Sequence, residues 1–99
     1  MPKATLMVRF KRSSDTAWMR KPAVYGSTGR VKSGLALFKD IKTGGSRVES
    51  IGENYSFEIR VEDGRTKYES AGKNAAAAEA KRLQIEARFK ARGVLRKAF

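Results

Sequence analysis

Cysteine and histidine are both missing from this chain of 99 residues. Without cysteine the chain can form neither a disulfide nor a cysteine-based zinc site, which favours an intracellular setting. Without histidine it lacks the commonest general base and the commonest metal ligand, so Ser/His/Asp and Cys/His arrangements are impossible. The ten Asp and Glu residues are scattered along the sequence. We therefore expect no catalytic residue, no metal, no cofactor and no small-molecule substrate.

Long apolar runs are missing as well. No stretch approaches the roughly 18 to 20 apolar residues that a membrane span needs. The opening MPKATLMVRFKR contains a short apolar stretch, residues 4–8, but charged residues lie too close to it for the core of a signal peptide. The sequence therefore predicts a soluble protein with no membrane partner.

Acidic residues are few compared with basic ones: 10 Asp and Glu stand against 22 Lys and Arg, which gives a net charge of +12. Residues 1–50 hold 11 basic residues against 3 acidic, residues 51–72 hold 3 against 5, and residues 73–99 hold 8 against 2. A basic excess of this size points first to nucleic acid as the partner.

Alternation of apolar and polar residues predicts several strands. It is strict over residues 55–62, where Tyr55, Phe57, Ile59 and Val61 form the apolar face. A short apolar run predicts another strand over residues 35–39. Near the N-terminus, residues 6–10 alternate in the same way, and residues 17–21 could pair back on them after a turn at 13–16. Pro22 and the glycines that follow indicate extended or looped chain to about residue 34.

The dipeptide Asp63 and Gly64 predicts a β-hairpin with a two-residue type I′ turn. This turn places Val61 opposite Thr66, so that apolar residues of the two strands share one face. A three-residue loop would shift the register and move Arg65 and Lys67 onto the apolar face, where burial would be costly. We therefore expect the tighter turn.

Asn74 is a suitable N-cap for a helix over residues 75–92, and Gly93 stands where a C-terminal cap is expected. The helix carries two apolar lines on nearly opposite faces, one through Leu83 and one through Ile85 and Phe89. One sheet can cover only one line. Ile85 and Phe89 either rest on the N-terminal segment, with Trp18 or Phe10 as partners, or they pack against a neighbouring domain.

The polar face of the predicted hairpin mixes both signs of charge. Such a face could read base edges, since arginine suits guanine and glutamate suits cytosine, or it could be an ordinary solvated surface of cross-strand ion pairs. Basic residues of the glycine-rich loops are better suited to phosphate contacts, which need reach more than precision. The candidates for these phosphate contacts are Arg30, Lys32, Lys39, Lys42 and Arg47.

The segment GENYSFEIRVEDGRTKYESAGKNAAAAEAKR, residues 52–82, is preceded by AVYGSTGRVKSGLALFKD, residues 23–40. Together they resemble the N-terminal region of phage-type integrases, the tyrosine recombinases: an aromatic strand, a tight turn, Tyr68-Glu69-Ser70 with Gly72, an Asn cap and an alanine-rich helix. The resemblance covers most of residues 19–93.

The resemblance implies an α+β fold, with a three-stranded antiparallel β-sheet packed against one C-terminal α-helix and an additional extended or β segment at the N-terminus. It also implies an arm-type module that binds double-stranded DNA, with the sheet face away from the helix in the major groove. The base-reading residues would be Arg60, Arg65 and Lys67. The catalytic Arg, His and Tyr of the family belong to a C-terminal domain, which a chain without histidine cannot contain.

The expected organisation is then an N-terminal segment or short hairpin over residues 1–22, a DNA-binding domain over residues 23–93, and the start of a linker over residues 94–99. The partners would be duplex DNA and downstream recombinase domains, in the cytoplasm of a prokaryotic cell with a prophage or mobile element. Two alternatives stay open: an RNA-binding module, and a protein interaction domain that docks through Ile85 and Phe89.

Overall fold

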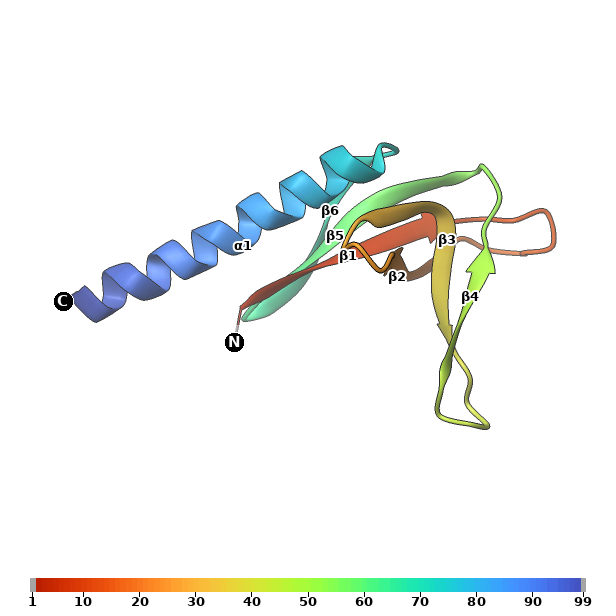
Figure 1. The fold of residues 1–99 in the computed structure, drawn as a ribbon, viewed down its shortest axis with the longest axis horizontal. Coiled ribbons are helices and arrows are strands. Elements are labelled where there is room, and N and C mark those ends of the chain that lie inside the picture. Colours follow the sequence, from red (N-terminus) through yellow and green to blue (C-terminus); the bar gives the residue numbers. More distant parts are fainter. Residues whose placement is uncertain (1, 99) are drawn as a thin grey trace.

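The computed structural model describes residues 2–98, and it describes side chains as far as residue 92. Within residues 2–98, six strands and one helix follow one another (Figure 1). Their bounds are β1 (Lys3–Phe10), β2 (Met19–Tyr25), β3 (Val31–Lys39), β4 (Ser46–Ser50), β5 (Tyr55–Asp63), β6 (Arg65–Gly72) and α1 (Ala75–Ala98).

The strands form one antiparallel sheet in the order β4-β3-β2-β1-β5-β6. The expected three-stranded sheet is therefore wrong, although the α+β class fits. The strands expected over residues 35–39 and 55–62 and the second strand of the expected hairpin correspond to parts of β3, β5 and β6, but β1 and β2 lie between β3 and β5. The strand β4 escaped prediction because it is an exposed edge strand, in which Val48 is the single large apolar residue.

The first strand lies at the centre of the sheet rather than in a separate segment. β1 pairs with β5 along its whole length, from Lys3 opposite Glu62 to Phe10 opposite Tyr55. On its other side it pairs with β2, where Met7 lies opposite Pro22. The domain boundary expected after Pro22 thus falls inside β2, and residues 3–10 belong to the same sheet as the rest.

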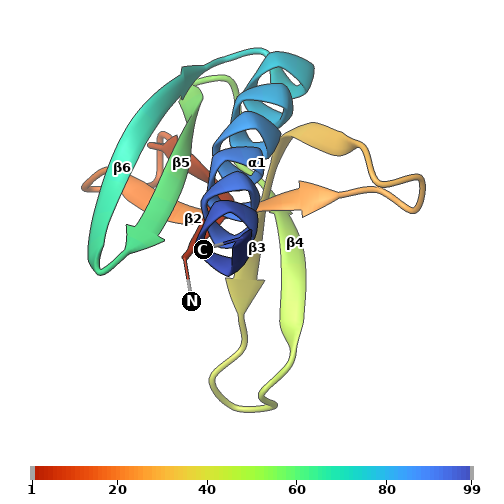
Figure 2. The same cartoon turned by 90° about the vertical axis from the view of Figure 1, so that its left-hand side faces the viewer.

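The core forms where α1 lies on one face of the sheet (Figures 1 and 2). Alternate residues of β1 and β5 point to this face and are almost fully buried, as the strand period requires. They meet Ala78 and Ile85 of α1 in one cluster, against which Phe89 also packs. The buried strand residues are Ala4, Leu6, Val8, Phe10, Phe57, Ile59 and Val61.

This packing decides between the two partners expected for Ile85 and Phe89. Ile85 is 3% exposed and shares the cluster with Phe10, so the line through Ile85 and Phe89 faces the chain's own sheet. Ile85 is therefore unavailable for packing against a neighbouring domain. The other apolar line is in solvent, where Leu83 is 51% exposed.

Hydrogen bonds among three polar side chains and the backbone fix α1 against the sheet beside this core. Arg82 donates from Nη1 to the backbone oxygen of Ala4 at 3.2 Å and from Nε to Glu79 at 2.6 Å. Tyr25, at the end of β2, donates from its hydroxyl to Glu79 at 2.7 Å. The helix is thereby connected to both β1 and β2.

The start of α1 agrees with prediction and its end does not. The Asn74 side chain accepts from the backbone N–H of Ala77 at 2.9 Å, so the predicted N-cap is confirmed. The helix then continues through Gly93 to Ala98, so the expected stop at residue 93 is wrong. One glycine costs a helix about 1 kcal/mol, and the helix-forming residues that follow can offset that cost. Residues 94–98 of the expected linker are thus helical, and residue 99 lies outside the described chain.

The register of the β5–β6 hairpin also differs from prediction. Asp63 pairs with Arg65 about Gly64, so the turn has three residues and Val61 lies opposite Lys67 rather than Thr66. Gly64 has φ of +75°, a left-handed conformation that glycine adopts without strain. The prediction failed because it assumed that the whole apolar face is covered. β6 is an edge strand, and Arg65 and Lys67 stay exposed there.

Candidate nucleic-acid interface

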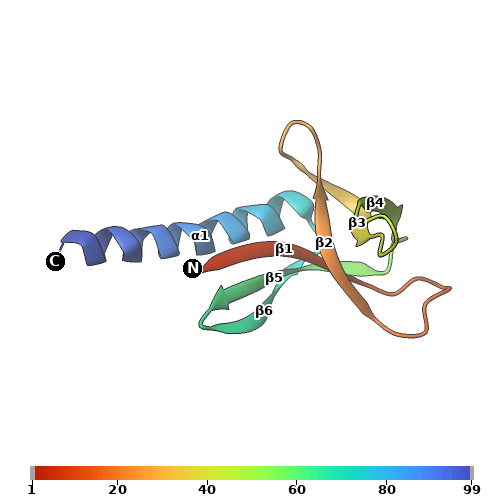
Figure 3. The same cartoon turned by 90° about the horizontal axis from the view of Figure 1, so that it is seen from below.

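The sheet has a second face, turned away from α1, which we call the open face. Strand alternation and the observed pairings assign residues of β1, β2, β5 and β6 to it. The view from below looks toward this side of the strands (Figure 3). The open face carries Lys3, Thr5, Met7, Arg9, Arg20, Glu58, Arg60, Glu62, Thr66 and Tyr68.

Arg20 is the most constrained cation of the open face. Its Nε donates to Glu58 Oε1 at 2.7 Å, and its guanidinium carbon lies 3.7 Å from the centroid of the Tyr68 ring. The hydrogen bond to Glu58 is the main cause that raises the pKa of Arg20, so the side chain stays charged. Met7, which lies between these strands, is only 4% exposed. A guanidinium fixed by an ion pair and a ring loses little freedom when it binds a ligand.

Three further cations share this face. Arg60 donates from Nε to Glu62 Oε1 at 3.1 Å, and Lys3 Nζ lies 3.9 Å from the same oxygen. Arg9 lies over the ring of Trp18, with 4.5 Å between its guanidinium carbon and the ring centroid. Trp18 is 45% exposed, just before β2 begins.

The open face therefore combines four cations with two carboxylates and two aromatic rings. The cations are Lys3, Arg9, Arg20 and Arg60; the carboxylates are Glu58 and Glu62; the rings are Trp18 and Tyr68. Both Arg20 and Arg60 use Nε for their ion pair, which leaves the η nitrogens as further donors.

The three residues expected to read bases do not share a face. Arg60 lies on the open face, as expected. Arg65 and Lys67 pair across from Asp63 and Val61, which turns them toward the α1 side of the sheet. The cause is the three-residue turn at Gly64, because a shift of one residue exchanges the two faces of a strand.

Sequence reasoning missed two arginines and one aromatic residue of the open face. Arg9 could have been found, because it alternates with Val8 and Phe10. Arg20 depends on the pairing of β1 with β2, which the sequence only suggested. The expected two-residue turn would place Tyr68 opposite Ile59 on the apolar face, so its contact with Arg20 could not be anticipated.

The basic loop residues lie at two separate hairpins. Arg30 and Lys32 belong to the β2–β3 hairpin, while Lys39, Lys42 and Arg47 belong to the β3–β4 hairpin. Figure 2 shows these two hairpins pointing in different directions from the sheet. The five residues thus form two basic corners rather than one patch.

Arg47 differs from the other four because it is part of an ion-pair network. It donates from Nε to Glu49 Oε2 at 2.6 Å, and Arg12 donates to the other oxygen of Glu49 at 3.1 Å. Arg12 also binds Asp15 through Nε at 3.0 Å. Hydrogen bonds from these arginines lower the pKa of both Glu49 and Asp15. The network connects the β1–β2 loop to β4.

Among the described residues, no helix is both long enough and apolar enough to cross a membrane. Comparisons of the chain with protein-family models, curated proteins and solved structures give no significant match.

Proposed function

We propose that this chain is the duplex-DNA-binding module of a phage-type integrase, and that its open face enters the major groove. The observation that carries the proposal is the arrangement of Arg9, Arg20 and Arg60 on an exposed sheet surface, each beside a carboxylate or an aromatic ring. β-structure is one of the elements that the major groove admits.

The width of the sheet that carries these arginines suits the groove. They come from three adjacent strands, in the order β2, β1 and β5. At about 4.8 Å between strands, the outer two strands lie about 10 Å apart. Arg9 lies opposite Arg20, whereas Arg60 lies opposite Thr5, so Arg60 is displaced from the other two by about 13 Å along the strands. The major groove is about 12 Å wide, so three strands fit and a fourth lies at its margin.

The chemistry of recognition follows from the ion pairs. An arginine that forks onto O6 and N7 of guanine is the commonest specific contact to a base. Glu58 and Glu62 hold Arg20 and Arg60 in place before binding, which reduces the entropy lost on contact. Either carboxylate could instead accept from the amino group of cytosine. The mixed charge of the face therefore favours selectivity over affinity.

The basic corners supply the affinity in this proposal. Arg30, Lys32, Lys39 and Lys42 lie on exposed hairpins and would contact phosphates on either side of the groove. Downstream recombinase domains of the same polypeptide would supply the catalytic residues. The protein would act inside a prokaryotic cell that carries a prophage or mobile element.

The test compares a duplex selected from a randomised pool with a shuffled duplex of the same composition. Arg20→Ala should cost about 1 to 3 kcal/mol in binding to the selected duplex and much less in binding to the shuffled one. Lys42→Ala should weaken both duplexes alike and reduce the salt slope by about 1. Fluorescence anisotropy at several salt concentrations measures both quantities.

Arg88→Ala is the matched control, because it removes the same charge from an exposed position on α1. It should change the two affinities equally and slightly. If Arg20→Ala and Arg60→Ala behave like Arg88→Ala, the open face does not read sequence and the proposal fails.

One observation favours a second candidate, single-stranded RNA. Trp18 and Tyr68 are both exposed on a sheet surface, where aromatic rings can stack on bases. However, Arg9 and Arg20 already lie over these rings. Competition between single-stranded RNA and duplex DNA, together with Trp18→Ala, separates the two: a loss of RNA binding alone would favour this candidate.

A further inference from the structure

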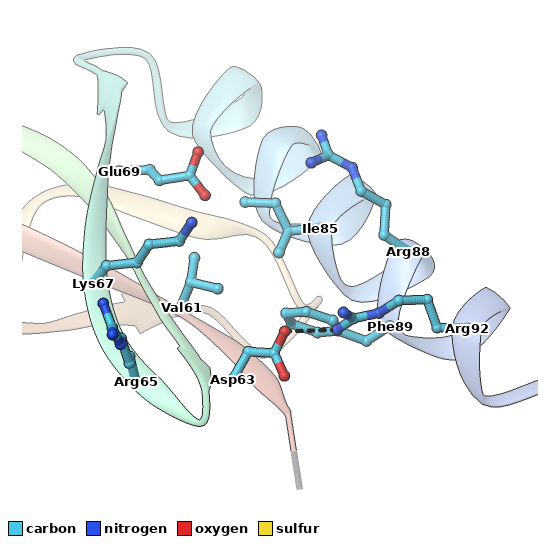
Figure 4. Close-up of a pocket in the computed structure, with 9 residues that line it drawn as sticks. All are labelled: Val61, Asp63, Arg65, Lys67, Glu69, Ile85, Arg88, Phe89 and Arg92. Atoms are coloured by element: carbon cyan, nitrogen blue, oxygen red, sulfur yellow. Dashed lines mark hydrogen bonds and ion pairs between the residues drawn. The ribbon is translucent and has the colours of Figure 1, made fainter. Parts of the chain in front are cut away.

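A groove lies between α1 and the edge strand β6, on the face of the sheet opposite to the open face (Figure 4). Its volume is about 550 Å³. Val61 and Ile85 are buried at its base, and Phe89 is partly exposed beside them. We call this the α1–β6 groove; its lining is Val61, Asp63, Arg65, Lys67, Glu69, Ile85, Arg88, Phe89 and Arg92.

Cations stand on both sides of the groove. Arg65 and Lys67 project from β6, and Arg88 and Arg92 project from α1 (Figure 4). All four are exposed. The two carboxylates are Asp63, which Arg92 binds at 2.8 Å, and Glu69. The lining therefore has a positive balance of two charges, arranged around an apolar base.

The groove is elongated. From Arg65 to Glu69 the lining follows β6 for four residues, which is about 13 Å at 3.3 Å per residue. From Ile85 to Arg92 it follows α1 for seven residues, which is about 10 Å at 1.5 Å per residue. Two turns of a ligand helix have this length, whereas a single phosphate or carboxylate would fill only a fraction of it.

We propose that the α1–β6 groove binds an acidic amphipathic helix of a partner protein. Apolar side chains of that helix would rest on the part of Phe89 that Arg92 leaves exposed, since the Arg92 guanidinium carbon lies 4.9 Å from the ring centroid. The carboxylates of the helix would pair with Lys67 on one side and Arg88 on the other. A helix in a groove is a recurring mode of peptide recognition, and complementary charge adds selectivity and speed of association.

One feature favours an acidic helix over duplex nucleic acid here. A duplex exposes phosphates and grooves, with no apolar side chain to cover Phe89. The groove also lies on the other side of the sheet from the open face, so it binds independently of the proposed DNA contact. Either proposal can therefore fail without the other.

The experiment uses the full chain and a fluorescein-labelled peptide of about fourteen residues, or four helical turns. The peptide consists of glutamate and leucine, with the leucines three and four residues apart so that they form one stripe. Anisotropy measures its binding to the wild type and to the double variant Lys67→Glu with Arg88→Glu. We expect the double variant to bind at least about tenfold more weakly, because like charges then face each other.

The matched control is Lys32→Glu with Lys42→Glu, which changes the net charge by the same amount away from the groove. It should bind the peptide as the wild type does. Circular dichroism checks that both variants are folded. A second peptide, with glutamine in place of glutamate, should bind poorly to all three proteins.

Three results would overturn the proposal: no binding of the glutamate peptide to the wild type, equal binding of the glutamine peptide, or equal weakening in both double variants. A further measurement uses a single-stranded oligothymidine as competitor. The groove is a site for single-stranded nucleic acid instead if two results are found together. The oligothymidine must displace the peptide, and the Lys67→Glu, Arg88→Glu variant alone must bind the oligothymidine about tenfold more weakly than the wild type does.

Discussion

Tyr25 shows how one side chain links the pH dependence of the fold to its packing. Its hydroxyl donates to Glu79, which two nitrogens of Arg82 also bind, at 2.6 and 2.9 Å. Burial and the bond to Glu79 raise the pKa of Tyr25 to about 12. Burial also acts to raise the pKa of Glu79, but hydrogen bonds from Arg82 and Tyr25 outweigh it and the pKa is lowered.

The first prediction follows from the sign of the Tyr25 shift. The folded pKa, about 12, is above the unfolded value of about 10. The stabilising contribution of Tyr25 is therefore fully present below pH about 10 and is lost as the pH rises toward about 12. Urea unfolding across this range should show a steeper loss of stability in the wild type than in Tyr25→Phe. Parallel profiles for the two proteins would contradict the prediction.

The hairpin between β5 and β6 is the element in which the local turn signal and the observed register disagree. A dipeptide such as Asp63 and Gly64 favours a two-residue turn, yet the chain adopts the longer one. The consequence is that Lys67 and Glu69 lie on the α1 side, where they help to form the α1–β6 groove. The turn therefore determines on which face of the sheet each side chain of β6 lies.

The second prediction concerns Gly64. Its φ is +75°, and a Cβ there would meet no atom within 4 Å, so a substitution costs conformational strain and causes no clash. Gly64→Ala should lower the free energy of unfolding by about 1 to 2 kcal/mol. Gly45→Ala is the control, because Gly45 has no positive φ and its Cβ would make an ordinary contact at 3.4 Å. Equal stability of the two variants in urea would contradict this explanation.

The elements that the sequence predicted correctly are those whose signal lies in neighbouring residues. The strand β5 and the start of α1 have strong local signals: a strict alternation, and an Asn cap before four alanines. A turn was expected at residues 13–16, and the structure has one at residues 12–15, where the backbone N–H of Asp15 donates to the backbone oxygen of Arg12 at 3.0 Å. The strand β4 has no such signal, because an exposed edge needs no apolar alternation.

The molecule as a whole depends on a pairing that no local pattern reveals. β1 was recognised as a strand, but its partner β5 lies far along the chain, and a central position cannot be inferred from alternation alone. The candidate site depended on the same information. Arg60 was found from its own strand, whereas the group formed by Arg20, Glu58 and Tyr68 required the order β2-β1-β5-β6.

The third prediction tests the central place of β1. A chain that lacks residues 1–22 loses β1 and half of β2, and thereby exposes the edge of β5 and the buried side chains of Phe57 and Ile59. We expect this fragment to be unfolded, with no cooperative thermal transition by circular dichroism. Removal of Met1 and Pro2 alone should leave the transition of the full chain unchanged. A cooperative transition in the fragment would instead support an independent domain over residues 23–93.

The antiparallel pairing of β1 with β5 also has a consequence for the order of events during synthesis. β1 leaves the ribosome before the other strands of this sheet, yet β5, which pairs with its second edge, is made only after three other strands. Closing such a long loop costs entropy before any contact compensates, so the local hairpins should form early and the whole sheet late. During that interval a nascent chain presents an apolar strand with an unpaired edge, the kind of surface that chaperones shield and that aggregates recruit.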